Sequence, residues 1–261
     1  MLQIEPVKAF ADNYLWVFHE AGGTTACAVD PGAAGPVLAY LEQANLQLSA
    51  ILVTHHHADH IGGINTLLQH FPVPVYGPGT PKIPQVTHPV VEGDVVRVLN
   101  HDFRVLTVPG HTLEHIAYTS TGKATAEGPV LFCGDTLFAA GCGRMFEGTP
   151  PVMHASLRKL AALSPDTQVF CAHEYTLSNL RFAAAVMPDN SDVQARIQHE
   201  SSKRERDQPT VPSSIGLELR TNPFMRCAEP LVIAAAQRQQ AGSNSDPATI
   251  FGILRRWKDS F

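Results

Sequence analysis

The chain has 261 residues, with 24 acidic and 19 basic side chains and a formal net charge of −5. This mild acidity gives no electrostatic reason to expect nucleic acid or an anionic membrane as a partner, and no apolar run approaches the roughly 20 residues of a membrane-spanning helix. A hydrophobic content of 44% is enough for a folded core, and the high count of thirteen histidines calls for a chemical explanation.

The first two thirds of the chain are typical of short strands separated by Gly and Pro, with helical patterns between them. We expect strands at 14–18, 25–30, 49–53, 103–108, 115–119, 129–133 and 168–172. Helical patterns occupy 36–44, 62–70 and 151–162. This mixture is typical of layered α/β or α+β packing.

After residue 173 the strand patterns thin out and helical patterns dominate. We expect helices at 176–187, 191–206, 228–240 and 247–260. The last begins well, because Asp246 suits the N-cap and Pro247 the first turn. One apolar stripe of this helix is assigned to the core: Ile250, Leu254, Trp257 and Phe261.

The five cysteines are scattered, odd in number and form no Cys-x-x-Cys motif. A disulfide framework is therefore not expected, and a reducing compartment fits better. The first ten residues carry no signal-peptide pattern, so we expect a cytoplasmic protein. No obligate protein partner is evident, and a monomer is favoured because no heptad pattern occurs.

Histidines cluster directly after one predicted strand, where residues 54–60 read Thr-His-His-His-Ala-Asp-His. Imidazole and carboxylate are ligands that suit zinc, iron or manganese. In an extended loop His55 and His57 point the same way and can hold one ion, whereas Asp59 and His60 lie further along and can reach a second. His56 points the other way and is not expected to be a ligand.

Three more ligand-type residues follow predicted strands: His111, Asp135 and His173. Each alone would more often be an ordinary turn or core residue, but chance does not readily place four such sites at strand ends. Five histidines and two aspartates exceed one tetrahedral zinc site and fit two ions about 3.5–4 Å apart, with a hydroxide bridging them. The residues predict a binuclear metal-dependent hydrolase, and the absence of Gly-x-Ser-x-Gly argues against serine chemistry.

The His cluster resembles the Thr-His-x-His-x-Asp-His motif of the metallo-β-lactamase superfamily. Four other segments resemble glyoxalase II, or hydroxyacylglutathione hydrolase: 141–150 (GCGRMFEGTP), 173–183 (HEYTLSNLRFA), 220–226 (RTNPFMR) and 255–259 (RRWKD). The resemblance covers essentially the whole chain. It implies an α+β fold, with a four-layer αββα metal-binding sandwich in 1–173 and a smaller α-helical, glutathione-binding domain in 174–261.

The resemblance also implies an activity, namely hydrolysis of S-D-lactoylglutathione to D-lactate and glutathione, the second step of methylglyoxal detoxification. His55, His57 and His111 would hold the first divalent ion, with zinc favoured over iron or manganese. The second ion would be held by Asp59, His60 and His173, with Asp135 bridging the two. Asp59 is primarily a ligand here, with proton acceptance from the attacking water as a second role.

The resemblance places the substrate-binding residues at Arg144, Phe146, His173, Tyr175, Arg255 and Lys258. Many relatives carry Lys at the position of Arg144 and Tyr at that of Phe146, which lacks the phenolic hydroxyl. Arg255 and Lys258 are three residues apart on a predicted helix and can share one carboxylate. The alternative is a pair of solvated cations near a helix C-terminus.

Several alternatives stay open at the level of the sequence. Asp30 either orients a metal-binding histidine or is a plain Asp-Pro-Gly turn residue. The rival functions are another hydrolase of the superfamily, acting on a lactone or β-lactam, a persulfide dioxygenase with one iron, and a non-catalytic metal-binding protein. The first is disfavoured by Arg144, Arg255 and Lys258, which such hydrolases need not carry.

Overall fold

The computed structural model describes residues 1–261, and the chain divides into two compact units. Unit 1 comprises Met1–Thr107, Glu114–Gly134 and Phe170–His173. Unit 2 comprises Val108–Leu113, Asp135–Val169 and Glu174–Phe261. None of the helices is at once long and apolar enough to cross a membrane.

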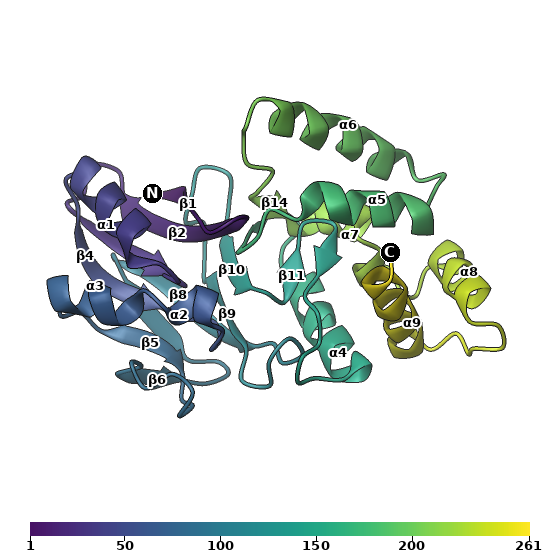
Figure 1. Ribbon diagram of the computed structural model, residues 1–261, viewed down its shortest axis with the longest axis horizontal. Coiled ribbons are helices and arrows are strands. Elements are labelled where there is room, and N and C mark those ends of the chain that lie inside the picture. Colours follow the sequence, from purple (N-terminus) through teal and green to yellow (C-terminus); the bar gives the residue numbers. More distant parts are fainter. The chain divides into compact units, whose positions relative to one another are not determined.

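Unit 1 contains a six-stranded sheet in which the strands follow chain order (Figure 1). Its strands are β1 (Leu2–Ala9), β2 (Asn13–Glu20), β3 (Thr25–Val29), β4 (Gln47–Leu52), β5 (Val75–Pro78) and β6 (His88–Val90). The first three run antiparallel, and the pairs from β3 to β6 are parallel. The connections include α1 (Ala34–Gln43), α2 (Ala58–Ile61) and α3 (Ile64–His70).

A second sheet in unit 1 packs against the first. It contains β7 (Val95–Val98), β8 (His101–Thr107), β9 (Ile116–Ser120) and β10 (Val130–Gly134), each antiparallel to the next. The end of β13 (Gln168–Cys171) lies beside β10.

The alternation of side chains along β2 explains this layering. Leu15 and Val17 are buried in a cluster with apolar side chains of α1 and α3. The next residue, Phe18, points to the other face, where its ring lies 5.5 Å from Phe103 of β8 and 5.3 Å from Phe132 of β10. Successive side chains of a strand point to opposite faces of the sheet. Because neighbouring side chains of β2 are buried, both faces of this strand are covered. Helices, sheet and sheet form three successive layers within unit 1.

Unit 2 is mainly helical. It contains β11 (Leu137–Phe138), β12 (Gly141–Cys142), α4 (Pro150–Ala161), α5 (Thr176–Val186), α6 (Ser191–Glu205), β14 (Ser213–Ser214), α7 (Ile215–Thr221), η1 (Pro223–Met225), α8 (Pro230–Gln239) and α9 (Pro247–Asp259). β14 pairs antiparallel with the start of β13, and β11 pairs with β12 as a hairpin. Figure 1 shows the two C-terminal helices, α8 and α9, beside each other.

The predicted N-terminus of α9 is confirmed, because the side chain of Asp246 accepts a hydrogen bond of 2.9 Å from the backbone N–H of Thr249. Ile250 and Leu254 are fully buried as expected. The assignment of Phe261 to the core is wrong, because this side chain is 58% exposed. The helix ends at Asp259, so helical spacing no longer directs the last side chain inward.

Every predicted strand and helix overlaps an observed one, and the α+β class with a C-terminal helical region is confirmed. The strands that were not predicted include β1, β5, β6 and β7. β1 carries Pro6 among charged residues, and β5 and β6 contain Pro as well. Pro is unfavourable within strands unless it lies at an edge, so these segments lacked a strand pattern.

Candidate metal and substrate site

The histidine cluster leaves the end of β4 in extended conformation and then enters a one-turn helix. His57 is the N-cap of α2, with φ −65° and ψ 147°, and α2 itself carries Asp59 and His60. The expectation of an extended loop is therefore wrong for these two residues. The helical turn directs the His60 ring inward, where it is 1% exposed.

Three of the predicted ligands converge within unit 1. The Nε2 atoms of His60 and His173 each lie 3.6 Å from Oδ2 of Asp59. The ligand atoms of the three residues lie within 4.8 Å of one another. His173 reaches this position because it lies two residues after the end of β13. Two imidazole nitrogens and a carboxylate oxygen at this spacing match the donors that a divalent ion takes.

The other ring nitrogen of each of these histidines is held by a carboxylate. Nδ1 of His60 lies 3.1 Å from Oδ2 of Asp30, and Nδ1 of His173 lies 2.9 Å from Oδ1 of Asp12. A carboxylate accepts a hydrogen bond from Nδ1–H, so the ring proton stays on Nδ1 and the lone pair lies on Nε2. This tautomer presents an unprotonated Nε2 to a metal ion, and such carboxylates raise the basicity of the ligand.

Asp30 is more than a turn residue. Its Oδ1 accepts a hydrogen bond of 2.7 Å from the Thr54 backbone N–H, and its Oδ2 accepts one of 2.7 Å from the Thr54 hydroxyl. The side chain therefore joins the end of β3 to the start of the histidine cluster and to His60. The interpretation of Asp30 as a residue that orients a histidine is the one that the structure supports.

Two supporting residues were not predicted, one in the turn between β1 and β2 and the other at the start of β2. Asp12 binds His173, and Asn13 donates a hydrogen bond of 3.0 Å from Nδ2 to Oδ2 of Asp59. Asp12 lies 161 positions from His173 in the chain. No local pattern connects such distant residues, and only the pairing of Asn13 with His173 in the folded chain brings them together.

His55 and His57 form a second pair of donors in unit 1. Nε2 of His55 lies 3.2 Å from Nδ1 of His57, and Nδ1 of His55 lies 3.1 Å from the Thr54 hydroxyl. Two nitrogens of a tetrahedral zinc site lie about 3.3–3.4 Å apart, because Zn–N bonds are about 2.0–2.1 Å. The pair therefore has the spacing of two ligands of one ion. His56 lies instead against Glu114, 3.9 Å away.

Unit 2 contains the other two predicted ligands, close together. Nε2 of His111 lies 3.4 Å from Oδ2 of Asp135, and Nδ1 of His111 lies 2.8 Å from the carbonyl oxygen of Arg144. The ring orientation is the same as for His60 and His173. Gly143 permits the approach, because a Cβ there would lie 1.9 Å from the carbonyl oxygen of Asp135. His111 and Asp135 thus also offer an imidazole nitrogen and a carboxylate oxygen that suit a divalent metal ion.

Of the predicted substrate residues, Arg144 and Arg255 meet at one carboxylate in unit 2. Oδ1 of Asp259 lies 3.6 Å from Nε of Arg144 and 3.0 Å from an Nη of Arg255. The other Nη of Arg255 donates a hydrogen bond of 2.9 Å to the carbonyl oxygen of Cys142. Arg255 is only 5% exposed, whereas the Arg144 side chain is 68% exposed.

Lys258 adds a third positive charge to this group. Its Nζ lies 3.2 Å from the carbonyl oxygen of Ser178 and above the rings of Phe182 and Phe261. Partial burial, followed by the charges of Arg255 and other arginines, lowers the pKa of Lys258 to about 8. An anion that bound here would restore the balance of charge.

Phe146 and Tyr175 are the two aromatic residues of the predicted substrate set. Phe146 is 65% exposed, and its ring lies 5.3 Å from that of His111. Tyr175 directly precedes α5 and packs edge-on against Phe138 at 5.3 Å. Both are thus placed in unit 2.

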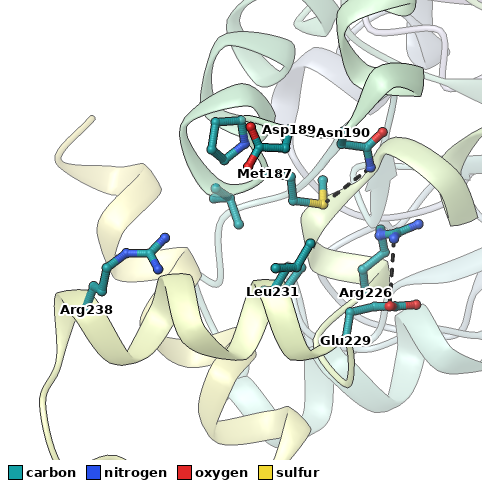
Figure 2. Close-up of a pocket in the computed structure, with 10 residues that line it drawn as sticks. Met187, Asp189, Asn190, Arg226, Glu229, Leu231 and Arg238 are labelled. Atoms are coloured by element: carbon teal, nitrogen blue, oxygen red, sulfur yellow. Dashed lines mark hydrogen bonds and ion pairs between the residues drawn. The ribbon is translucent and has the colours of Figure 1, made fainter.

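A cavity elsewhere in unit 2 contains none of the predicted residues (Figure 2). It has a volume of about 150 Å³ and lies between the end of α5 and α8. Its lining combines apolar and charged side chains: Val186, Met187, Pro188, Asp189, Asn190, Arg226, Glu229, Leu231, Val232 and Arg238. Within it Arg226 pairs with Glu229 at 3.8 Å.

Comparison with known proteins gives two family matches that together span most of the chain. Residues 21–173 match the metallo-beta-lactamase superfamily, and residues 174–261 match the C-terminus of hydroxyacylglutathione hydrolase. The hydroxyacylglutathione hydrolase of Nitrosomonas europaea is 49% identical over 100% of this chain and 97% of its own length.

Two solved structures are also similar. ETHE1 from Myxococcus xanthus has a TM-score of 0.66 at 22% identity, covering 98% of this chain and 90% of that one, and bears on the fold alone. The crystal structure of TTHA1623 in a di-iron-bound form has a TM-score of 0.60 at 26% identity. It covers 84% of this chain and 99% of that one.

Proposed function

Since this chain belongs to the hydroxyacylglutathione hydrolase family of the metallo-β-lactamase superfamily, we propose that it hydrolyses the thioester bond of S-D-lactoylglutathione. The oxygen of a water molecule bonds to the acyl carbon, and the C–S bond breaks. The departing sulfur takes up a proton from the water, so the products are D-lactate and the free thiol of glutathione. The observation that carries this proposal is the group formed by Asp59, His60 and His173, in which both imidazoles present Nε2 to one carboxylate.

Two divalent ions, with zinc favoured and iron or manganese also compatible, are the proposed cofactors. His55, His57 and His111 are assigned to the first ion, Asp59, His60 and His173 to the second, and Asp135 to the bridge between them. The ligand count supports two ions, since seven donors exceed the three or four of a mononuclear zinc site. The similar protein whose structure is a di-iron-bound form adds support for two.

Ions held by these residues would polarise the thioester carbonyl and lower the pKa of a water molecule to near neutrality. Asp59 is held by Asn13, so its carboxylate stays oriented and can accept a proton from the attacking water. The carboxylates of Asp30 and Asp12 keep His60 and His173 in the ligand tautomer. Because a thiolate is a good leaving group, the reaction needs no strong general acid.

The carboxylates of glutathione are proposed to be attracted by three cations, Arg144, Arg255 and Lys258. Further contacts to the substrate are assigned to Tyr175, His173 and Phe146. Arg144 and Arg255 already share the carboxylate of Asp259, and the positive charge of Arg255 helps to lower the pKa of Lys258, so this part of unit 2 suits an anion. Phe146 can supply only apolar contact. On this basis residues 1–173 carry the metal chemistry, and residues 174–261 help to bind glutathione.

The reaction would be the second step of methylglyoxal detoxification. Glutathione and its thioesters are intracellular compounds, and all five cysteines are buried and form no disulfide, so we place the enzyme in the cytoplasm. A monomer suffices for the proposed chemistry, because every assigned residue comes from one chain.

A chelator-controlled thioester assay tests the proposal. Purified protein should consume S-D-lactoylglutathione, lose this activity after metal removal and regain it when zinc is added back. Failure to hydrolyse the thioester while the metals are fully bound would contradict the proposal. The rival functions are tested with other substrates in separate assays. These are a β-lactam, a lactone, and glutathione persulfide, for which oxygen consumption is measured.

A matched pair of variants tests the glutathione contacts. Lys258→Ala should raise KM for S-D-lactoylglutathione sharply with little change in kcat. Arg238→Ala removes an exposed cation from the last turn of α8 and should leave both constants unchanged. An equal KM in the two variants would remove Lys258 from the substrate site.

A further inference from the structure

A short hairpin in unit 2 connects Asp135 to Arg144. Its strands β11 and β12 have two residues each, paired as Leu137 with Cys142 and Phe138 with Gly141. At its turn, Ala140 has a φ of +55°, a left-handed conformation that a residue with a Cβ adopts rarely. Two-residue strands and an unfavourable turn do not hold a hairpin in place by themselves.

Two fully buried side chains from α7 and the residue after it hold this turn. Oε2 of Glu218 accepts a hydrogen bond of 2.8 Å from the backbone N–H of Ala140. Nδ2 of Asn222 donates to the carbonyl oxygens of Gly141 at 2.9 Å and Phe138 at 3.3 Å. Nδ2 of Asn222 also lies 2.9 Å from Oε2 of Glu218, so the two side chains act as one clamp. We call them the Glu218–Asn222 clamp.

The other oxygen of Glu218 is fixed from the opposite side. Oε1 lies 2.8 Å from an Nη of Arg196 and accepts a hydrogen bond of 2.5 Å from the hydroxyl of Ser213. Arg196 is 4% exposed and Glu218 is not exposed at all. Removing the two charges of such a pair from water costs a large desolvation free energy, and apolar residues of similar volume often stabilise the fold equally well. What apolar residues cannot supply is a charged acceptor aimed at the N–H of Ala140.

The held hairpin is linked at both ends to proposed site residues. The backbone N–H of Gly143 donates to the carbonyl oxygen of Thr136 at 3.3 Å, which closes the segment next to Asp135. The carbonyl oxygen of Arg144 is the partner of Nδ1 of His111 at 2.8 Å. A shift of the hairpin would therefore displace the Asp135 carboxylate and the acceptor that orients His111 at the same time.

We propose that Glu218, acting with Asn222 through the hairpin, is a positioning residue that sets the Asp135 carboxylate and the orientation of His111. The proposal rests on the proposed function, in which Asp135 and His111 are metal ligands. Glu218 itself touches neither ligand, so its effect is transmitted by the backbone from Ala140 to Arg144. Small displacements of reacting groups reduce rates by large factors, of the order of 10² for about 1 Å.

The test compares Glu218→Gln with Glu200→Gln. Glu200 is a matched control, because it is another buried carboxylate in unit 2, 3% exposed, and pairs with Lys203 at 3.1 Å on its own helix α6. Hydrogen exchange of the Ala140 amide should be at least tenfold faster in Glu218→Gln than in the wild type. Its kcat should fall at least tenfold and its affinity for zinc should weaken, whereas Glu200→Gln should stay within twofold of the wild type in all three measurements.

Equal exchange at Ala140 in the two variants would overturn the proposal, and so would faster exchange with unchanged kcat and zinc affinity. If Glu218→Gln does not fold, Asn222→Ala decides the question, because it leaves the pair of Glu218 with Arg196 intact. Asn222→Ala should likewise show faster hydrogen exchange at the Ala140 amide, a lower kcat and a weaker affinity for zinc. An exchange rate at Ala140 equal to that of the wild type would overturn the proposal. If the wild type does not hydrolyse lactoylglutathione, the proposed function fails, while exchange and zinc affinity still test the clamp.

Discussion

Replacement of Asp30 by Asn should weaken metal binding without distorting the backbone. Asp30 has a φ of +49°, a conformation that Asn adopts as readily as Asp. The carboxylate accepts from the Thr54 N–H, the Thr54 hydroxyl and Nδ1 of His60. An amide has one oxygen, and the Thr54 N–H at 2.7 Å from Oδ1 requires it. The NH₂ group then faces His60.

An NH₂ group opposite Nδ1 of His60 favours the wrong tautomer. Nδ1 would have to accept, so the ring proton would move to Nε2, the atom that faces Asp59 at 3.6 Å. Loss of such a supporting carboxylate costs about 10–100-fold in metal affinity. This corresponds to roughly 1.4–2.8 kcal/mol, because each tenfold change is about 1.4 kcal/mol.

Competition with a chromophoric chelator, followed by metal analysis of the protein, measures this affinity. Asp12→Asn applies the same change to His173, but the Asp12 side chain is 39% exposed, so water can restore the lost acceptor and the effect should be smaller. Circular dichroism confirms that both variants are folded. Wild-type metal affinity in Asp30→Asn, or a larger loss in Asp12→Asn, would refute the tautomer argument.

Three further predictions concern single residues. The Lys258 charge is present at pH 7 and is lost as the pH rises through its lowered pKa of about 8, so KM should rise several-fold between pH 7 and 9 in the wild type but stay flat in Lys258→Arg. Gly134 has a φ of +46°, and a Cβ there would lie 2.3 Å from the Thr54 hydroxyl. Gly134→Ala should therefore lower the free energy of unfolding by about 1–3 kcal/mol, as measured by calorimetry. An unchanged Tm would contradict this. His56→Ala should retain both metals and a kcat within twofold, because His56 pairs with Glu114, and loss of a metal would make it a ligand.

The elements of unit 1 that carry the site were largely predictable, because each is a short apolar strand followed by a polar turn. The C-terminal halves of β4, β10 and β13 are apolar and buried, and these strands precede His55, Asp135 and His173. The edge strand β1 was not predictable, because its alternation is interrupted by Pro6. The one-turn helix α2 was also missed, since four residues are too few to show a helical period.

Within the site, the residues with metal-binding chemistry could be predicted, but the residues that orient them could not. Asp30 had an ambiguous signal, as part of an Asp-Pro-Gly turn. Asp12 and Glu218 had no signal, because their partners His173 and Ala140 lie 161 and 78 positions away in the chain. Such contacts arise from the tertiary fold, and only a three-dimensional structure reveals them.

Titration of metal into the stripped enzyme, with hydrolysis of S-D-lactoylglutathione measured at each step, tests the central claim most directly. Metal content and activity are determined on the same sample. The predicted result is no activity without metal and saturation of kcat at two equivalents of zinc per chain. Hydrolysis by the metal-free protein, saturation at one equivalent, or two bound ions without hydrolysis would contradict the account.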